Sequence, residues 1–276
     1  MPTAASSKRL VALLTYVGKD MPEMCTLFFR FYTGYHGLIR RDIFVVQSGS
    51  SLDSCLRQHR PTILRSDSSE QPFRERRKLA WLQESQHSLL QKYQYVLIAD
   101  LDEFFLPDPA RYTNLPDYLS RRFNSAASPF VAPLGYEIMP MSRTEESLNW
   151  SRPVLRQRTR WARLCGMDKP VLTTVPLRYT FGTHSAVALS PSGAVEVESA
   201  RHKAFACRSR HSDEQLFNLH LKCIDLTAWT EELMDTDRRP KGAAANGSKV
   251  SAYAQTRCYR PQPKGINPVP HRLRVF

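Results

Sequence analysis

The stretch YVLIADLDEFF, residues Tyr95–Phe105, decides the fold of this chain. An apolar run leads directly into Asp100 and Asp102, and Glu103 follows at once. A buried strand that ends in closely spaced carboxylates is typical of α/β folds, in which ligands bind at the carboxyl ends of parallel strands. The stretch therefore predicts both a strand and a ligand site at its end.

In the sequence before this strand, apolar runs alternate with helical patterns. This alternation predicts an α/β fold with a mainly parallel sheet and helices on both faces. The expected strands cover residues 10–17, 42–46 and 62–64, and the expected helices cover 21–35, 51–58 and 73–93. Within the longest helix an apolar stripe is expected from Leu79, Trp81, Leu82, Leu89 and Leu90. Past residue 109 a helix is expected over 118–123 and strands over 130–134, 171–179 and 186–189, with a last helix over 227–234.

Charge is distributed unevenly along the 276 residues, of which 42% are hydrophobic. The formal net charge is +13, but nine of the 39 Lys and Arg lie in residues 238–276, which contain no Asp or Glu. The remaining 30 basic and 26 acidic residues give the body a net charge of +4. We therefore expect a short disordered N-terminus over 1–8, one folded domain over 9–237 and a basic flexible tail over 238–276.

The six cysteines include no C-x-x-C pair, so a zinc site of the common kind is not expected. Their scatter favours reduced thiols in a cytoplasmic protein. The apolar run over 10–17 is too short to span a bilayer. Any membrane contact is expected to be peripheral, through the basic tail, and no specific nucleic-acid partner is expected.

The acids at the strand end suit a divalent cation. Side chains of Asp100 and Asp102 would point to opposite faces of a continuing strand, but Phe104-Phe105-Leu106-Pro107 indicates that the strand ends here. One carboxylate then binds an ion directly and the other acts through water or a sugar hydroxyl. Carboxylates with open positions suit Mg²⁺ or Mn²⁺, which complete their shells with water and phosphate.

Four segments in order resemble those of GT-A glycosyltransferases, closest to the branch of glycosyltransferase family 2 with a D-x-D-E-F motif and to the related family 92. The first is residues 98–107, which contain Asp100-Leu101-Asp102-Glu103-Phe104. The others are Gly166–Val171, which contains Asp168-Lys169, then Gly182-Thr183-His184-Ser185, and finally Leu216–Lys222, which contains His220. The likeness covers roughly residues 8–235.

The resemblance implies a GT-A fold, a nucleotide-binding half over 9–109 and an acceptor half over 110–237. It implies metal-dependent transfer of a sugar, most simply from a UDP-sugar, to an acceptor hydroxyl of a saccharide or glycoconjugate, with inversion preferred over retention. By position, Asp100 and Asp102 serve the ribose and the metal–diphosphate, and His220 completes the metal shell. Lys169 and Lys222 are candidates for diphosphate binding, and His184 for substrate contact.

An inverting transferase also needs a general base near the acceptor hydroxyl. The candidates in the sequence are Glu103, Asp168, Asp213 and Glu214, and Asp168 is preferred because it sits beside Lys169. The sequence departs from the family pattern at residues 18–20 and 47–50, where the Asn-Glu and the Asp that usually help to hold the base and ribose are absent.

Other interpretations remain open. A haloacid-dehalogenase-type phosphotransferase also uses D-x-D, but on its first strand and with Thr or Val at the position of Phe104. A non-catalytic protein that binds polyanions through its basic tail would need residues 238–276 and not Asp102. Arg156, Arg158 and Arg160 alternate, so a strand there would place all three on one face, where they would bind an anionic acceptor or the donor diphosphate.

Overall fold

The computed structural model describes residues 8–18, 22–67, 75–122, 129–139, 146–163, 167–179, 183, 186–190, 193–197, 212–222, 224 and 267–268. Contacts within the chain divide it into two compact units. Unit 1 comprises residues 1–135 and 165–218, and unit 2 comprises residues 136–164 and 219–276. The boundaries of these units do not coincide with residue 109, where the nucleotide-binding half was expected to end. The division into a nucleotide-binding half and an acceptor half stays a prediction.

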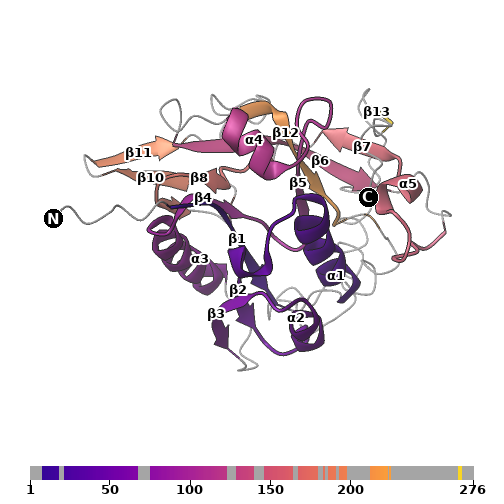
Figure 1. The fold of residues 1–276 in the computed structure, drawn as a ribbon, viewed down its shortest axis with the longest axis horizontal. Helices are drawn as coiled ribbons and strands as arrows, with labels where there is room; N and C mark the ends of the chain where they lie inside the picture. The colour runs from indigo at the N-terminus through magenta and orange to yellow at the C-terminus, as the bar shows by residue number, and fades with distance from the viewer. Residues whose placement is uncertain are drawn as a thin grey trace, which may run out of the picture. The chain divides into compact units, whose positions relative to one another are not determined.

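The first half of unit 1 follows the predicted strand–helix alternation (Figure 1). Its elements are β1 (Arg9–Val17), α1 (Pro22–Arg30) with a π-helical turn (Phe31–Tyr35), a 3₁₀ turn (Arg40–Asp42), β2 (Ile43–Ser48), α2 (Asp53–His59), β3 (Thr62–Asp67), α3 (Glu75–Leu90) and β4 (Tyr93–Ile98). The pairs β1–β2, β1–β4 and β2–β3 are parallel. The order β4-β1-β2-β3 confirms the mainly parallel sheet of an α/β protein.

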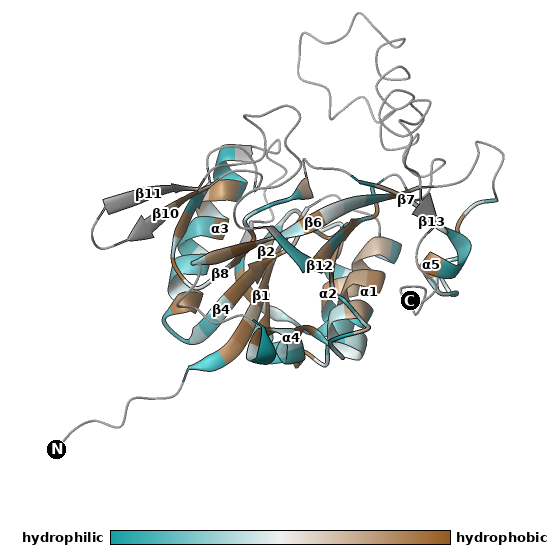
Figure 2. Ribbon diagram, turned by 90° about the horizontal axis from the view of Figure 1, so that it is seen from above, coloured by the Kyte–Doolittle hydropathy of each residue, from teal (hydrophilic) through white to brown (hydrophobic). Residues whose placement is uncertain are grey.

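β1, β2 and β4 are buried on both faces and are apolar at nearly every position, whereas Ile63 and Leu64 of the edge strand β3 are exposed. Figures 1 and 2 show α3 on one face and α1 with α2 on the other, and Figure 2 shows the hydrophobic colouring of β1 and β4. Side chains on the α3 face form one core cluster with the predicted stripe of α3, of which Leu79, Leu82, Leu89 and Leu90 are buried and Trp81 is partly buried. The alternate positions, such as Leu13 and Val45, are fully buried on the opposite face.

The remaining strands of unit 1 are shorter and mostly antiparallel. They include β5 (Glu103–Pro107), β8 (Leu172–Thr173), and a three-stranded sheet of β9 (Leu177–Tyr179), β10 (Ala186–Ser190) and β11 (Gly193–Val197). The start of β6 (Phe130–Met139) pairs with β8, which pairs with β4 in antiparallel fashion, so the central sheet is mixed. The predicted strand over 171–179 is therefore two strands, separated by residues 174–176.

The helix α4 (Leu115–Arg121) begins where the sequence supplies a cap. Asn114 precedes it, and its Oδ1 accepts a hydrogen bond from the backbone N of Asp117 at 2.9 Å. The strand β12 (Ser212–His220) follows later in the chain and pairs with β5 and β6. β5 had not been expected, because Phe104-Phe105-Leu106 was interpreted only as the end of the preceding strand.

Unit 2 contains α5 (Val154–Gln157), β7 (Arg160–Arg163) and β13 (Asn267–Pro268). The second part of β6 pairs with β7, and the ring of Tyr136 stacks on that of Trp161 at 4.3 Å between centroids. β13 pairs with β7 in turn. Residues 267–268 are the part of the tail expected over 238–276 that the structure describes, and the expectation of a flexible tail stays a prediction. The last helix expected over 227–234 lies outside the described residues.

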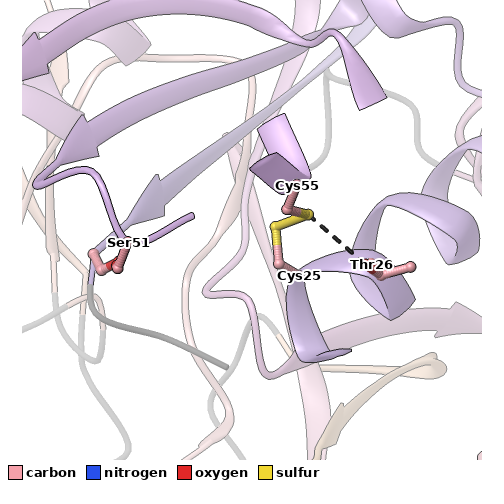
Figure 3. The surroundings of a disulfide bond; sticks show 5 residues. Cys25, Thr26, Ser51 and Cys55 are labelled. Atoms are coloured by element: carbon pink, nitrogen blue, oxygen red, sulfur yellow. Dashed lines mark hydrogen bonds between the residues drawn. A yellow bond between two sulfur atoms is a disulfide. The ribbon is translucent and has the colours of Figure 1, made fainter. Parts of the chain in front are cut away.

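A disulfide joins Cys25 of α1 to Cys55 of α2, with their Cα atoms 6.6 Å apart (Figure 3). The hydroxyl of Thr26 lies 3.9 Å from the Cys55 sulfur. The expectation of reduced thiols is wrong for these two residues, because helix packing brings together cysteines 30 positions apart. The other four cysteines lie outside the described residues. None of the described helices is long and apolar enough to cross a membrane.

Candidate active site

The acidic stretch forms a tight turn immediately after β4. The backbone N of Glu103 donates to the carbonyl of Asp100 at 3.0 Å, and the backbone N of Asp100 donates to Glu103 Oε2 at 3.2 Å. Leu101, within the turn, is buried with 3% of its surface exposed. The strand therefore ends where the sequence predicted, and the turn holds Asp100, Asp102 and Glu103 close together.

Lys169 reaches this turn from a distant part of the chain. The backbone N of Ile98 donates to the carbonyl of Val171 at 3.0 Å, which places the segment before β8 beside the end of β4. The Lys169 ammonium forms a close ion pair with Glu103 Oε1 and lies 3.4 Å from Asp100 Oδ2. The structure thus brings Lys169 together with the acids, and its expected role in diphosphate binding stays a prediction.

Lys78 of α3 completes the group and was not found from the sequence. Its ammonium lies 2.7 Å from Asp100 Oδ1 and 5.4 Å from the ring centroid of Tyr16 on β1. No motif marks this lysine, and the only possible signal was its place on the helix that precedes the acidic strand. We call Lys78, Asp100, Asp102, Glu103 and Lys169 the β4-end cluster.

Burial and charge oppose each other within the β4-end cluster. Burial raises the pKa of Asp100, but the ammonium groups of Lys78 and Lys169 outweigh it and hold that pKa well below its ordinary value. Burial lowers the pKa of Lys169, but the carboxylates of Glu103, Asp100 and Asp102 raise it above its ordinary value. Both shifts favour the charged forms of Asp100 and Lys169. Counted formally, the three carboxylates and two ammonium groups of the cluster sum to one net negative charge.

The β4-end cluster lies at the point where the strand order reverses. β1 has β2 and β3 on one side and β4 on the other, and all four strands are parallel. In open α/β sheets, ligands bind outside the carboxyl ends of the strands at such a point. Asp100 follows β4 there, and the backbone N of Ala99 bonds the carbonyl of Leu14 on β1 at 3.1 Å.

The structure also places the candidate bases. Asp168 is 3% exposed, and its Oδ1 accepts from the backbone N of Gly135 at 2.7 Å. Glu103 is 1% exposed within its pair with Lys169. Asp213 Oδ2 accepts from the hydroxyl of Tyr118 at 3.1 Å, and Glu214 is exposed. The observed contacts of the first three stabilise local structure, and the base role of each candidate stays a prediction.

His220 and Lys222 belong to unit 2. His220 Nδ1 lies 2.6 Å from Glu137 Oε2, and both side chains are buried. A carboxylate on one ring nitrogen is the usual support of a metal-ligating histidine, and it is equally suited to a buried structural one. Lys222 is exposed, and His184 lies outside the described residues. Among the residues that the structure describes, no three His, Cys, Asp or Glu side chains are grouped to hold a metal.

The Arg-rich segment does not form the alternating face that its spacing suggested. Arg156 lies in α5 and Arg160 begins β7, so the two residues belong to different elements. Arg158 between them is 4% exposed, and it donates to the carbonyls of Ile224 and Glu146, both at 2.8 Å. The three arginines therefore do not share one strand face, and the buried guanidinium of Arg158 bonds backbone carbonyls instead of facing a ligand.

A second group of polar side chains lies at the end of β2, where the sequence departs from the family pattern. The Gln47 amide nitrogen donates to the carbonyl of Gly49 at 2.9 Å and forms a close hydrogen bond with Asp53 Oδ1. Gly49 has a positive φ of 79°, which favours glycine in this turn. The first residue of α2 thus brings a carboxylate to the end of β2.

No protein-family model matches the chain, and a search of curated proteins finds no matching sequence.

Proposed function

We propose that the chain is a glycosyltransferase that takes a sugar from a nucleotide-sugar donor, with the donor diphosphate at the β4-end cluster. The observation that carries the proposal is the position of this cluster, outside the carboxyl ends of β1 and β4 where the strand order reverses. The four segments that resemble the GT-A pattern supply the reaction class. A saccharide or glycoconjugate hydroxyl is the proposed acceptor.

In this proposal the lysines and acids of the cluster have different roles. Glu103 and Lys169 are almost fully buried, so their ion pair fixes the turn and the Asp100 carboxylate rather than meeting the acceptor. Lys78 is 14% exposed and Asp102 is half-buried, so both side chains reach solvent at the end of β4. Lys78 would contact the diphosphate, and Asp100 would orient Lys78 and the ribose.

A divalent cation fits this arrangement through Asp102. Magnesium is commonly held by one or two carboxylates plus substrate phosphates, and it does not need a cage of protein ligands. The net negative charge of the cluster would repel a diphosphate, and a bound Mg²⁺ or Mn²⁺ would reverse that sign and stabilise the leaving diphosphate. Both oxygens of Asp100 meet ammonium groups, which would compete with a cation for that carboxylate.

The rival phosphotransferase finds less support in the same geometry. Its D-x-D would lie on the first strand, whereas Asp100 and Asp102 follow β4, which is fourth along the chain. The proposal assigns no general base, because Asp168 and Glu103 are both covered and an acceptor hydroxyl must come within hydrogen-bond reach of its base. Inversion and the UDP-sugar preference rest on the resemblance alone.

The test is a thermal-shift panel of nucleotide sugars with and without Mn²⁺. A donor at one hundred times its dissociation constant should stabilise the wild-type protein by about 2.7 kcal/mol. Asp102→Ala should lose the metal-dependent part of this stabilisation, and Lys78→Ala should weaken binding with metal present. Glu84→Ala, which removes an acid 62% exposed elsewhere on α3, is the matched control and should respond like the wild type.

The proposal fails if no nucleotide sugar stabilises the wild-type protein with metal present. It also fails if Asp102→Ala and Glu84→Ala respond alike, because the site would then lie elsewhere.

A further inference from the structure

The tripeptide Asn149-Trp150-Ser151 matches the acceptor pattern for N-linked glycans, Asn-x-Ser/Thr without proline in the middle. It lies in the turn before α5, in unit 2. Asn149 and Ser151 are both exposed, as an acceptor must be to meet a transferase and carry a bulky glycan. The match is neither buried nor part of a helix or strand.

The turn holds the two defining side chains together. Ser151 donates twice to the Asn149 side-chain oxygen, from its hydroxyl at 2.6 Å and from its backbone N at 3.0 Å. The side chain of Gln157 fixes the Asn149 backbone on both sides, accepting from its N at 2.8 Å and donating to its O at 2.9 Å. The carboxamide oxygen is therefore engaged by the serine, and the amide nitrogen is the group left for reaction.

A second and independent observation concerns the compartment. The disulfide between Cys25 and Cys55 in unit 1 is of the kind that forms and persists in oxidising compartments, and cytosolic proteins seldom keep one. N-linked glycans are carried by surface loops of secreted proteins, which pass through such a compartment. The disulfide and the exposed acceptor turn thus point to the same environment.

We propose that Asn149 is an N-glycosylation site and that the chain folds in an oxidising compartment of the secretory route. The Asn149 amide nitrogen forms a bond to C1 of an oligosaccharide carried on a polyprenyl diphosphate. The bond from C1 to the diphosphate oxygen breaks, the lipid diphosphate leaves with the electron pair, and the nitrogen loses one proton. This proposal replaces the cytoplasmic location expected from the sequence, and it is independent of the proposed transferase activity.

The acceptor is tested by expressing the full chain behind a cleavable secretory leader in eukaryotic cells. Asn246-Gly247-Ser248 matches the same pattern outside the described residues, so every variant also carries Asn246→Gln. The Asn246→Gln parent should lose mass on treatment with peptide-N-glycosidase, with Asn149 converted to Asp in its peptide. Ser151→Ala should abolish the shift. Ser151→Thr, which keeps the hydroxyl, should retain it.

Two results overturn the proposal. A parent chain that is secreted with Asn149 unmodified shows that the turn is not an acceptor. Protein isolated from its own cells with Asn149 unmodified and with Cys25 and Cys55 alkylated as free thiols shows that the chain does not enter an oxidising compartment. A non-reducing peptide map that links Cys25 to Cys55, together with a glycan on Asn149, supports it.

Discussion

Removal of the Lys169 charge tests the electrostatic account of the β4-end cluster most directly. The Lys169 side chain is 3% exposed and its partner Glu103 is 1% exposed, whereas Asp100 is 25% exposed and also contacts Lys78. Lys169→Met keeps the length of the side chain but leaves the Glu103 carboxylate buried without its cation. Such a loss costs about 3–5 kcal/mol of the free energy of unfolding, because the uncompensated charge stays out of water.

The second step is to remove the partner charge as well. Lys169→Met with Glu103→Gln removes the buried charge pair, so the double variant should be more stable than Lys169→Met alone by at least about 1.5 kcal/mol. Asp100 keeps its contact with Lys78 in both variants. Glu84→Gln is the control, because the Arg65–Glu84 pair is 45% and 62% exposed and its loss should cost less than about 1 kcal/mol.

The assay is urea unfolding at neutral pH, followed by tryptophan fluorescence and circular dichroism, with the free energy extrapolated to water. Two outcomes refute the reasoning. In the first, Lys169→Met costs no more than Glu84→Gln, so the buried ion pair is not what stabilises the turn. In the second, the double variant is as unstable as the single one, so the loss comes from packing rather than charge.

Two further predictions concern the rest of unit 1. Burial lowers the pKa of His36 from 6.5 to about 3. Between these pH values only the unfolded state binds a proton at this side chain, so the contribution of His36 to the free energy of unfolding falls by about 1.4 kcal/mol for each pH unit of acidification. Urea unfolding from pH 7 to pH 4 gives the slope of the free energy of unfolding against pH. This slope should be shallower for His36→Asn than for the wild type, and unchanged for the control His87→Asn, whose side chain is exposed. Equal slopes in all three proteins contradict a lowered pKa for His36. The disulfide closes a loop of 30 residues, so reduction, or the double replacement of Cys25 and Cys55 by Ser, should cost about 3.6 kcal/mol. Thiol titration that finds both cysteines free before reduction contradicts this prediction.

The sequence predicted the helices and strands in which apolar residues follow a regular pattern. The apolar runs before Val17 and Asp100 became β1 and β4, and the stripe from Leu79 to Leu90 became the buried face of α3. It also predicted that the acidic strand ends at Asp100. These features are local. A strand that is buried on both faces must be apolar at successive positions, and a helix with one buried face must carry apolar residues every three or four positions.

Prediction weakened where an element depends on a distant partner. β5 pairs with β12, and neither the register nor the existence of that pair is visible in Phe104-Phe105-Leu106. A strand over 156–160 would have placed Arg158 on one face with Arg156 and Arg160, but its guanidinium is buried against the carbonyl of Ile224, 66 residues away. A local pattern carries no information about which backbone carbonyl a long side chain will meet.

What the sequence by itself determined is the kind of fold and the kind of residue at the candidate site: parallel strands with helices, and acids at the end of β4. Only the tertiary structure decided which cations neutralise those acids. Lys78 meets Asp100 because α3 packs across β4, and Lys169 reaches Glu103 because the chain returns beside Ile98. Charge pairing acts over a few ångströms in space, and distance along the chain does not predict it.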